Sequence, residues 1–446
     1  MKLRDVVAGA NASMYHRLDF QKIRGVYYPR SEAEVVEAIE QARAKGYEIT
    51  PKGGGSGLSG ACTGGNRDRF IVSTLQMKEL LTISKDQGYV DVQPGATPDE
   101  INEVLEPMGM KLYVSPSSRD IATLGGLLAT DGGGNDTWAN GTMRDNTVRV
   151  KMVLYDGRRL IVDWEGVRSD DAELALELNK KDMTIHDVAS AHGTLGFVTE
   201  LRVTIRPLVE EHLMGAIAVY EDFDALGSAL DRMIKSETPI RYGEAIVEAH
   251  KDVRDDLTPP ILILEFPEKE KASIAETTDF EEVDSGELER LKDIRIKLPK
   301  RNPNEGVQAA LFEGYGFFED SLRGMQSRME AINGLLIEDG FEPFAKYGHG
   351  PSKWYLGDNT PAFGLIMHSR EIRPTDKTGK ELFETVLKIV DLCDDMGITP
   401  KPEHKWPFSD KAKKTRIEEL RTIIGEGFNA FIFEPECASE TLSSMV

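Results

Sequence analysis

Hydrophobic positions in the first two hundred residues alternate between a strand-like and a helix-like spacing. Apolar residues recur at helical spacing over 35–42, and Ser31 with Glu34 forms an N-capping signal, so a helix is predicted there. Runs rich in β-branched and aromatic residues predict short strands at 47–51, 70–73 and 89–93. A further helix is predicted from Pro98, and the alternation continues to Pro207. This pattern indicates an α/β unit that closes near that residue.

The pattern changes near residue 209. Glycine becomes sparse, and the very acidic stretch 268–289 predicts a solvated helix or loop. Strands are predicted at 261–264 and 364–367, and helices at 322–337 and 380–396. We therefore predict an N-terminal segment (1–27), a first domain (28–208) and a second, α+β domain (209–446). The sequence leaves open whether the C-terminal part of the second domain returns to the first.

Composition narrows the classes of function. Of the 446 residues, 40% are hydrophobic and 29% are charged, an ordinary globular balance. The net charge of −22 argues against nucleic acid, which is bound through Lys and Arg. No apolar run is long enough for a transmembrane helix and the N-terminus has no apolar signal region, so a cytoplasmic protein is expected.

Cysteine usage narrows the redox chemistry. The chain has three widely spaced cysteines, Cys62, Cys393 and Cys437, with no CxxC motif. Such a set builds neither an iron–sulfur cluster nor a thiolate zinc site, and a disulfide framework is implausible. Redox activity would therefore require a bound organic cofactor, or a metal held by histidines and carboxylates.

Seven glycines lie between positions 53 and 65. Glycines let backbone amides turn inward and let a diphosphate approach the main chain closely. A Walker loop would end in Gly-Lys-Ser/Thr, which is absent, and a dinucleotide fingerprint would open a helix. The run 69–73 that follows is β-branched and aromatic, so the loop is predicted to join two strands.

Five sequence blocks follow one another in order. They are P-x-G-G-G-(S/T)-x-L-S-G at 51–60, P-S-S at 116–118, T-x-G-G-x-x-A-T-x-x-G-G at 123–134, G-x-x-R-D at 141–145, and G-T-L-G-(I/F)-(I/V)-T-E at 193–200. Together they resemble the FAD-binding domain of the vanillyl-alcohol oxidase / p-cresol methylhydroxylase (PCMH) superfamily. The branch that looks most similar is that of the D-lactate dehydrogenase and glycolate oxidase flavoprotein subunits. The resemblance implies an α+β fold: a PCMH-type FAD-binding domain of two α/β subdomains, here 28–208, plus an α+β cap domain for the substrate, here 209–446.

The resemblance also implies a set of FAD contacts. The glycine loop would cradle the diphosphate, and Val198 would contribute backbone contacts near the adenosine end. The ribityl and isoalloxazine region would be lined by Pro116, Ser117, Thr123, Gly125, Gly126, Ala129, Gly132 and Gly133. The loop residues concerned are Lys52, Gly53, Gly54, Gly55, Ser56, Gly57, Leu58 and Ser59. Because this loop carries no histidine and Cys62 lies just outside it, non-covalent FAD is expected.

In the similar family, two histidines and a glutamate bind a metal, and a further histidine is the base. The blocks at His349 and at Glu403-His404 match parts of that pattern, which implies His349 and Glu403 as ligands and His404 as base. The second histidine is missing at the usual spacing, but His368 could be the same block displaced by an insertion. Zinc, iron and manganese all suit such ligands.

Two further features bear on the substrate and the tail. Arg295 resembles the family's R-x-x-x-P segment, whose guanidinium pairs with the substrate carboxylate, and Lys346 is a weaker candidate for that role. The tail 428–438 does not match the family's usual N-P-G-K-like ending.

The function that the resemblance implies is an FAD-dependent dehydrogenase of a D-2-hydroxy acid such as D-lactate or glycolate. Hydride would pass to flavin N5, and the electrons would pass to an iron–sulfur or electron-transfer flavoprotein partner. Two alternatives stay open: a metal-free flavin oxidase of another alcohol, aldehyde or sugar acid, and a non-catalytic flavin-binding subunit of a larger electron-transfer complex.

Overall fold

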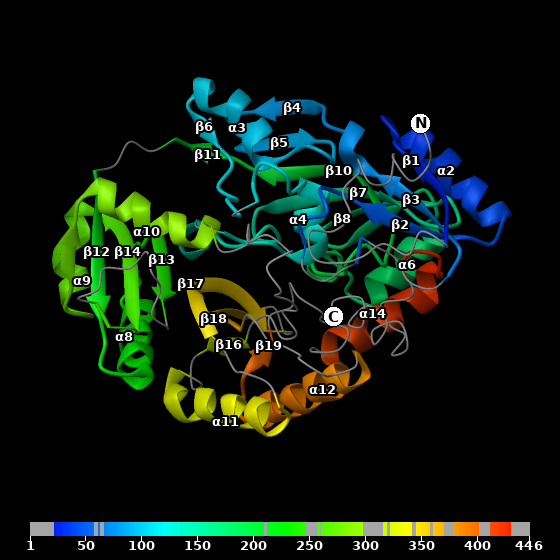
Figure 1. Ribbon diagram of the computed structural model, residues 1–446. Coiled ribbons are helices and arrows are strands. Elements are labelled where there is room, and N and C mark those ends of the chain that lie inside the picture. Colours follow the sequence, from blue (N-terminus) through cyan, green and yellow to red (C-terminus); the bar gives the residue numbers. More distant parts are fainter. Residues whose placement is uncertain are drawn as a thin grey trace.

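The computed structural model describes most of the chain. The described residues are 22–57, 61–62, 67–116, 118–134, 136–208, 212–246, 257–258, 260–297, 315–318, 322–340, 345–356, 360–369, 379–400 and 411–429. Five residues with predicted roles lie outside them, namely Leu58, Ser59, Ser117, Glu403 and His404. We call the elements from β1 to β11 the first lobe and those from β12 to β19 the second lobe (Figure 1).

The first lobe opens with a parallel sheet of three strands. In it, β3 (Arg69–Ser73) lies between β1 (Ile23–Tyr27) and β2 (Glu48–Lys52). Helix α2 (Glu32–Ala44) covers this sheet, and its N-cap Ser31 accepts a hydrogen bond from the amide of Glu34, as the sequence predicts. The strand predictions at 47–51 and 70–73 are confirmed within one residue.

The parallel pairing explains the long connection between β2 and β3. Parallel neighbours cannot be joined by a tight hairpin, because the chain must return along the sheet before the second strand begins. The glycine-rich segment that follows Lys52 forms this return. Its first residues, 53–57, therefore lie at the carboxyl end of β2, before any ligand is considered.

A six-stranded antiparallel sheet, in the order β4-β5-β10-β7-β8-β9, forms the larger part of the first lobe. Its strands are β4 (Leu80–Ser84), β5 (Tyr89–Val92), β7 (Thr147–Val153), β8 (Arg159–Asp163), β9 (Val167–Ser169) and β10 (Phe197–Thr204). The lobe also has the short pair β6 (Met110–Lys111) and β11 (Arg206–Pro207), and two 3₁₀ turns (Thr74–Gln76 and Glu106–Met108). Its other helices are α3 (Pro98–Leu105), α4 (Leu124–Thr130), α5 (Thr137–Asn140), α6 (Ala172–Lys180) and α7 (Ile185–Val188).

The second lobe is built on an eight-stranded antiparallel sheet, in the order β15-β12-β14-β13-β17-β18-β16-β19. The strands are β12 (Leu213–Val219), β13 (Tyr242–Ile246), β14 (Ile261–Pro267), β15 (Glu281–Val283), β16 (Tyr315–Phe318), β17 (Ala345–Leu356), β18 (Thr360–Ser369) and β19 (Thr399–Pro400). The helices are α8 (Phe223–Lys235), α9 (Lys271–Ala275), α10 (Ser285–Lys297), α11 (Met325–Glu338) and α12 (Gly379–Asp395), and the 3₁₀ turn is Glu268–Glu270.

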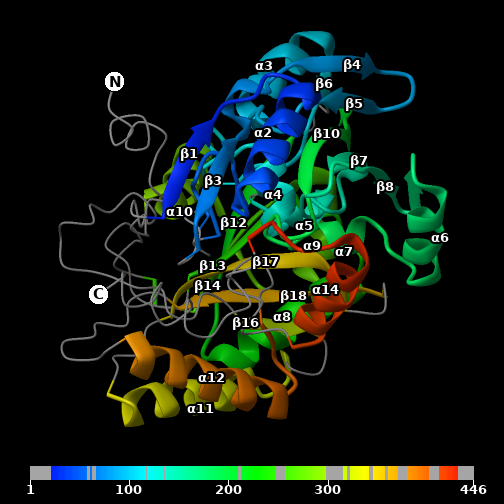
Figure 2. The same ribbon diagram turned by 90° about the vertical axis from the view of Figure 1, so that its right-hand side faces the viewer.

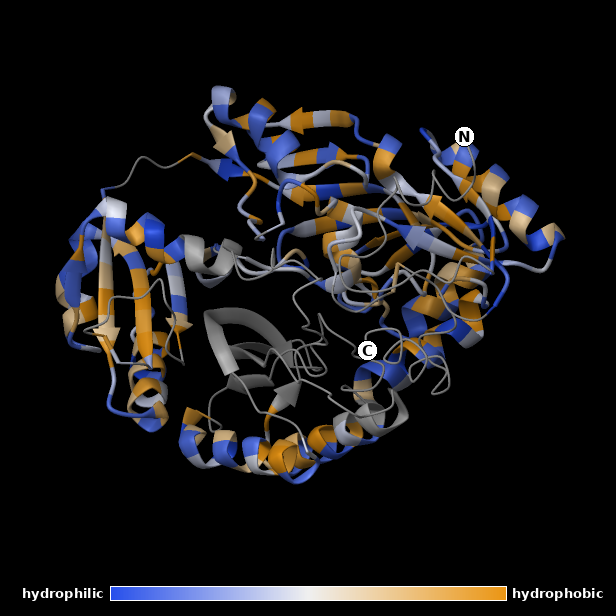
Figure 3. Ribbon diagram, viewed as in Figure 1, coloured by the Kyte–Doolittle hydropathy of each residue, from blue (hydrophilic) through white to orange (hydrophobic). Residues whose placement is uncertain are grey.

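Both faces of the β12–β14 region are covered. Leu262 and Leu264 of β14 pack in one hydrophobic cluster with α8 and α11, whereas Ile261 and Ile263 pack in another with α10. A strand buried on both sides needs apolar residues at every position, which explains the unbroken run at 261–264 (Figure 3). The prediction of a strand there is confirmed.

The acidic stretch 268–289 is more structured than predicted. It includes α9, the strand β15 and the start of α10, and β15 pairs antiparallel with β12. Val283 and Leu288 are buried although acidic residues surround them in sequence. The prediction of a solvated helix or loop is therefore wrong for this strand, because two buried apolar residues suffice to attach it to the sheet edge.

The chain returns to the first lobe near its C-terminus. Helix α14 (Lys411–Ile424) lies beside α6 in both views (Figures 1 and 2). Arg416 donates hydrogen bonds to both carboxylate oxygens of Asp187, at 2.8 and 3.0 Å, and Ile417 and Leu420 join the core of the first lobe. None of the described helices combines the length and the apolar composition that a bilayer crossing requires.

A tryptophan joins the two lobes. Trp138 of α5 is 9% exposed and belongs to the hydrophobic cluster of the second lobe, and α5 contacts both β13 and β17. A Cβ added at Gly243 of β13 would overlap the Trp138 ring. The indole therefore packs against a strand position where only glycine leaves room.

We predict that Gly243→Ala lowers stability by roughly 1–3 kcal/mol, because the new methyl group forces the Trp138 ring away from the sheet. The measurement is the midpoint of thermal unfolding. Gly334→Ala is the control, since this helical glycine of α11 has open space where its Cβ would lie and should raise stability by about 0.5–1 kcal/mol. Equal effects of the two substitutions would contradict the packing described.

Candidate functional site

The glycine loop lies against the segment that precedes α4. A Cβ at Gly53 would overlap the side chain of Thr123, and a Cβ at Gly54 would overlap the carbonyl oxygen of Ile121. Real Cβ atoms do not approach other atoms so closely, so both positions require glycine. The structure thus brings together the first block, 51–60, and the third block, 123–134, which are about 70 residues apart in sequence.

The backbone amides of this loop are available to a ligand. Among the described residues, none accepts a hydrogen bond from the main-chain amides of 53–57. Gly55 has a left-handed backbone (φ 75°), a conformation that favours glycine. Consecutive amides that have no protein acceptor form a concave set of donors of the kind that binds phosphate oxygens.

The amides at the start of α4 are already used. The amide of Leu124 donates to the carbonyl of Ala96 and that of Gly125 to the carbonyl of Pro94, both at 2.9 Å. The amide of Gly126 donates to the hydroxyl of its N-cap Thr123 at 3.3 Å. The amides of Gly125 and Gly126 therefore already have acceptors within the protein. These residues can contribute to a cofactor site through the space that their missing side chains leave.

The glycines after α4 hold the second and third blocks together. A Cβ at Gly134 would overlap the carbonyl of Ser115, which directly precedes Pro116. Gly132 donates its amide to Leu127 at 2.8 Å, and a Cβ at Gly133 would lie 2.6 Å from the hydroxyl of Thr137. The contact of Gly134 brings the end of the third block beside Ser115 and Pro116 of the second block.

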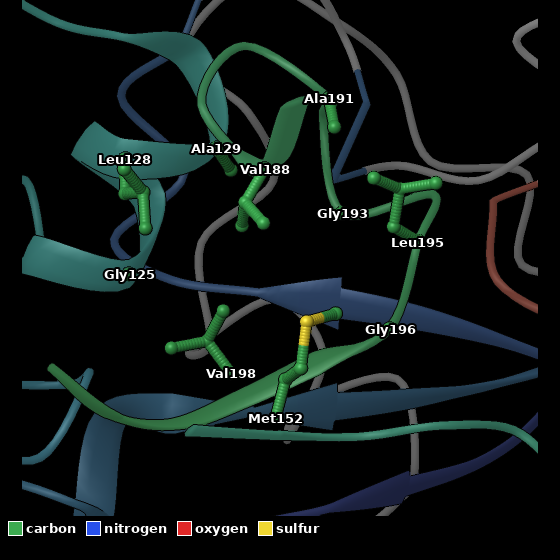
Figure 4. A pocket seen from close by; sticks show the side chains of 10 residues that line it. All are labelled: Gly125, Leu128, Ala129, Met152, Val188, Ala191, Gly193, Leu195, Gly196 and Val198. Atoms are coloured by element: carbon green, nitrogen blue, oxygen red, sulfur yellow. The ribbon is translucent and has the colours of Figure 1, made fainter. Parts of the chain in front are cut away.

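An apolar slot opens between α4 and the antiparallel sheet (Figure 4). Its cavity volume is about 20 Å³, roughly the space of one water molecule. Its lining includes three residues with predicted FAD contacts, Gly125, Ala129 and Val198. The complete lining is Gly125, Leu128, Ala129, Met152, Val188, Ala191, Gly193, Leu195, Gly196 and Val198. The walls are apolar, as the walls of small-molecule pockets usually are.

A buried ion pair fixes the turn after α4. Asp131 and Arg144 are at most 2% exposed, and their side chains form an ion pair at 3.1 Å. Asp131 also accepts the amide of Arg144 at 3.0 Å. Removing one partner of such a pair leaves an uncompensated buried charge, which costs about 3–5 kcal/mol. The G-x-x-R-D block therefore has a structural role that the sequence did not specify.

Burial shifts two pKa values around this ion pair. Burial, with the cations Lys413, Arg144 and Arg416, lowers the pKa of His186 to about 2, so its imidazole is neutral and accepts a hydrogen bond from Arg144 at 2.9 Å. Burial, with the nearby Asp131 carboxylate, raises the pKa of Asp145 to about 6. The Asp145 carboxylate accepts the amide and hydroxyl of Thr142. The described site thus contains one carboxyl group that titrates near neutral pH.

A second charged group lies where the lobes face each other. Burial raises the pKa of Asp136, which precedes α5, and the charges of Lys111, Lys292 and Arg241 lower it in part. Lys292 of α10 also pairs with Glu265 of β14 at 2.6 Å. The sequence missed this set, because its members come from four separate elements and no local motif connects them.

The predicted metal ligands are placed only in part. His349 lies in β17 opposite Ile366 of β18, and His368 lies in β18 opposite Tyr347, so the two histidines are on paired strands. Arg295 lies in the last turn of α10, one turn after Lys292. Glu403 and His404 are outside the described residues. Within the ranges that the structure describes, no three His, Cys, Asp or Glu residues gather into a metal site.

We predict that Gly54→Ala reduces the FAD content of the purified protein at least about tenfold, because a Cβ there cannot coexist with the Ile121 carbonyl and the loop must shift. Flavin absorbance per protein is the measurement. Gly46→Ala is the matched control: it carries the strain of a left-handed backbone (φ 67°), but its Cβ would meet open space. It should lose about 1 kcal/mol of stability and keep its flavin.

We also predict that Asp145→Asn stabilises the protein above pH 6 but not at pH 4. Because the folded pKa of Asp145 is raised from 3.8 to about 6, its contribution to stability is present below pH 3.8 and is lost as the pH rises through 6. The variant should gain roughly 1–3 kcal/mol at pH 7.5. Thermal midpoints at both pH values measure this, with the exposed Asp120→Asn as control. A gain that is equal at pH 4 and pH 7.5 would rule out this titration.

Comparison with known proteins agrees with this geometry. Residues 23–163 match the family described as FAD binding domain. D-2-hydroxyglutarate dehydrogenase of Escherichia coli (strain K12) is 31% identical over 163 residues, which cover 36% of this chain and 15% of that protein. D-lactate dehydrogenase of Archaeoglobus fulgidus is 25% identical over 206 residues, 46% of this chain and 44% of that protein. The probable mitochondrial D-lactate dehydrogenase of Danio rerio is 28% identical over 210 residues, 47% of this chain and 40% of that protein.

Each of these alignments spans less than half of the relative's length. Among solved structures, an alkyldihydroxyacetonephosphate synthase superposes with a TM-score of 0.61 at 18% identity, over 90% of this chain and 75% of that one. At this identity the likeness shows the fold alone. The α+β class predicted from the sequence is confirmed, and so is the family resemblance: residues 23–163 form an FAD-binding domain of the PCMH type.

Proposed function

We propose that the protein is an FAD-dependent dehydrogenase that oxidises a D-2-hydroxy acid and passes the electrons to another protein. The observation that carries the proposal is the row of main-chain amides at 53–57, which have no acceptor among the described residues. They follow a parallel strand directly and lie against the segment before α4, where no Cβ fits. A diphosphate supplies the missing acceptors.

The residues of the first lobe would hold the diphosphate and one ring of the cofactor. The loop amides orient the diphosphate, and the apolar slot beside α4 excludes water from one aromatic ring. The second lobe is attached to this domain through Trp138 of α5. When bound, the isoalloxazine supplies the hydride acceptor for the hydroxyl-bearing carbon of the substrate.

A 2-hydroxy acid requires two groups from the protein, a cation and a base. The substrate carboxylate needs a cation, and we assign this role to Arg295 on α10, the helix that also carries the half-buried Lys292. The hydroxyl proton needs a base, and we assign this role to His404 on the basis of its family block. Support for the substrate class comes from the relatives, which are named as dehydrogenases of D-2-hydroxyglutarate and D-lactate.

We assign no step to a metal. His349 and His368 lie on paired strands, but the described residues do not complete a ligand set around them. Metal analysis of the purified protein tests whether His349, His368 and Glu403 bind a metal together. A stoichiometric divalent metal that is lost in the variant His349→Ala would add a metal to the proposal, and its absence would favour the metal-free reaction.

The electrons are proposed to leave through an iron–sulfur protein or an electron-transfer flavoprotein. The support is compositional: the three cysteines of the chain are widely spaced and build no iron–sulfur cluster. The measurement compares how fast the reduced flavin is oxidised by such a carrier with how fast it is oxidised by oxygen.

We predict that D-lactate or D-2-hydroxyglutarate bleaches the flavin absorbance of the holoenzyme under anaerobic conditions, whereas the L-enantiomers do not. His404→Asn should slow the bleaching by a factor of about 10²–10⁴, as expected for loss of a general base. His212→Asn, a histidine with an exposed side chain at the start of the second lobe, is the control and should bleach normally. Bound FAD that no hydroxy acid reduces would contradict the proposed reaction while leaving the cofactor site intact.

A further inference from the structure

A fully buried asparagine, Asn146, follows the G-x-x-R-D block and connects three segments of the first lobe. Its Nδ2 donates to the carbonyls of Asn140 at 2.9 Å and Thr142 at 2.8 Å. Its Oδ1 accepts a hydrogen bond from the guanidinium of Arg206 at 2.7 Å. Its own carbonyl accepts the amide of Thr204 at 2.8 Å. The structure therefore uses both ends of the side-chain amide, which fixes its orientation.

One of these segments is α5, the short helix that reaches the second lobe. Asn140 is its last residue, and Trp138 in the same helix packs in the hydrophobic cluster of the second lobe, with its ring against Gly243 of β13. Asp136, which precedes the helix, lies close enough to the second lobe for the charge of Lys292 on α10 to act on it. The position of α5 therefore sets this contact between the lobes.

Another of these segments is the strand by which the chain leaves the first lobe. Arg206 belongs to β11, which pairs with β6 (Figure 1). Directly after this strand, the amide of Leu208 donates to the carbonyl of Gly109 in the first lobe at 2.9 Å. By His212 the chain has reached the second lobe, because the carbonyl of that residue accepts the amide of Glu268 at 2.9 Å. The hydrogen bond from Arg206 to Asn146 thus ties the covalent connection between the lobes to α5.

Arg206 is half-buried without a carboxylate to pair with. Burial lowers the pKa of this guanidinium, and Tyr113 and Asp145 oppose the shift in part. Among the residues that the structure describes, Arg206 forms no ion pair, and its side chain donates to the neutral amide oxygen of Asn146. Moving a cation out of water without an ion-pair partner is unfavourable, and an apolar side chain of similar length would avoid that cost. What the described structure gains from an arginine here is the contact with Asn146.

We propose that Asn146 and Arg206 are positioning residues that fix the second lobe relative to the cofactor domain. A lobe held at one point can rotate about it, whereas two linked points of attachment restrict that rotation. The connection after β11 and the packing of Trp138 are two such points, and Asn146 is bonded to the segments that carry both. The effect on the reaction rests on the proposed function: groups of the second lobe that bind a hydroxy acid must be held accurately relative to the flavin.

The first test follows Trp138 in holoprotein that contains 5-fluorotryptophan. The chain has four tryptophans, and the ¹⁹F signal that disappears in Trp138→Phe belongs to Trp138. In Arg206→Met this signal should shift, and its solvent isotope shift should increase, because the indole is held less firmly in the second lobe. Arg206→Lys keeps a cationic donor and should restore the wild-type signal.

The matched control is Arg202→Met. Arg202 donates two hydrogen bonds of 2.7 Å to Asp91 within the sheet of the first lobe, so its loss destabilises the protein at least as much. Because Arg202 has no link to α5 among the described contacts, the Trp138 signal should stay as in the wild type. Asn146→Ala should reproduce the change seen in Arg206→Met, and the two substitutions together should add little, because they break one unit. The Arg206 variants decide the question even if Asn146→Ala does not fold.

The second test measures anaerobic flavin reduction by D-lactate and by D-2-hydroxyglutarate. In Arg206→Met the substrate concentration for half-maximal rate should rise at least about tenfold, while the flavin content stays within about twofold of the wild type. An unchanged Trp138 signal in Arg206→Met overturns the proposal, and so does an equal change in Arg202→Met. A wild type whose flavin no hydroxy acid reduces would instead refute the proposed function, and the Trp138 signal would still test the positioning of the lobes.

Discussion

The close approach of two backbone segments is the constraint on which the rest of this structure depends. The glycine loop after β2 lies so near to the segment 121–123 that neither Gly53 nor Gly54 can carry a side chain. Because that segment caps α4 and directs the amides of Leu124 and Gly125 to carbonyls of the fold, α4 cannot shift to relieve the contact. The result is a closely packed junction beside a loop, 53–57, whose amides have no acceptor among the residues that the structure describes. Rigidity matters here because donors that are already oriented bind an anion at a smaller entropic cost.

The surroundings of α4 show how this rigidity is maintained. At its C-terminal end, Asp131 adopts a left-handed backbone and pairs with Arg144, and both side chains are almost completely buried. The neutral His186 accepts from the same arginine, and the residues beside it are tied by Lys413 and Arg416 to the C-terminal helix α14. Fold and cofactor cleft are thus coupled: a charge pair that is costly to break holds the helix whose surface forms the slot.

Local signals in the sequence predicted the parts of this arrangement that depend on neighbours in the chain. The capping residue Ser31 and the strands on either side of the glycine loop lie where they were expected. Properties that depend on distant partners could not be predicted. The ion pair of Arg144 joins residues 13 positions apart, and nothing in the sequence of β15 indicates that Val283 would attach it to β12. The assignments to Arg295, His349, His368 and Lys346 rest on family blocks and remain predictions. The structure adds that the two histidines share paired strands.

The C-terminal segment illustrates the same limit from the opposite direction. The sequence showed only that the tail does not match the family ending. The structure shows that Phe428 of the tail forms a parallel backbone bridge with Ile49 of β2. Since β2 leads directly into the glycine loop, any displacement of the C-terminal segment must also disturb the anchor of that loop. A ligand that binds only the form with this segment docked would stabilise docking by the same free energy by which docking strengthens binding. In this way a domain matched over 23–163 depends on residues more than 250 positions later in the chain.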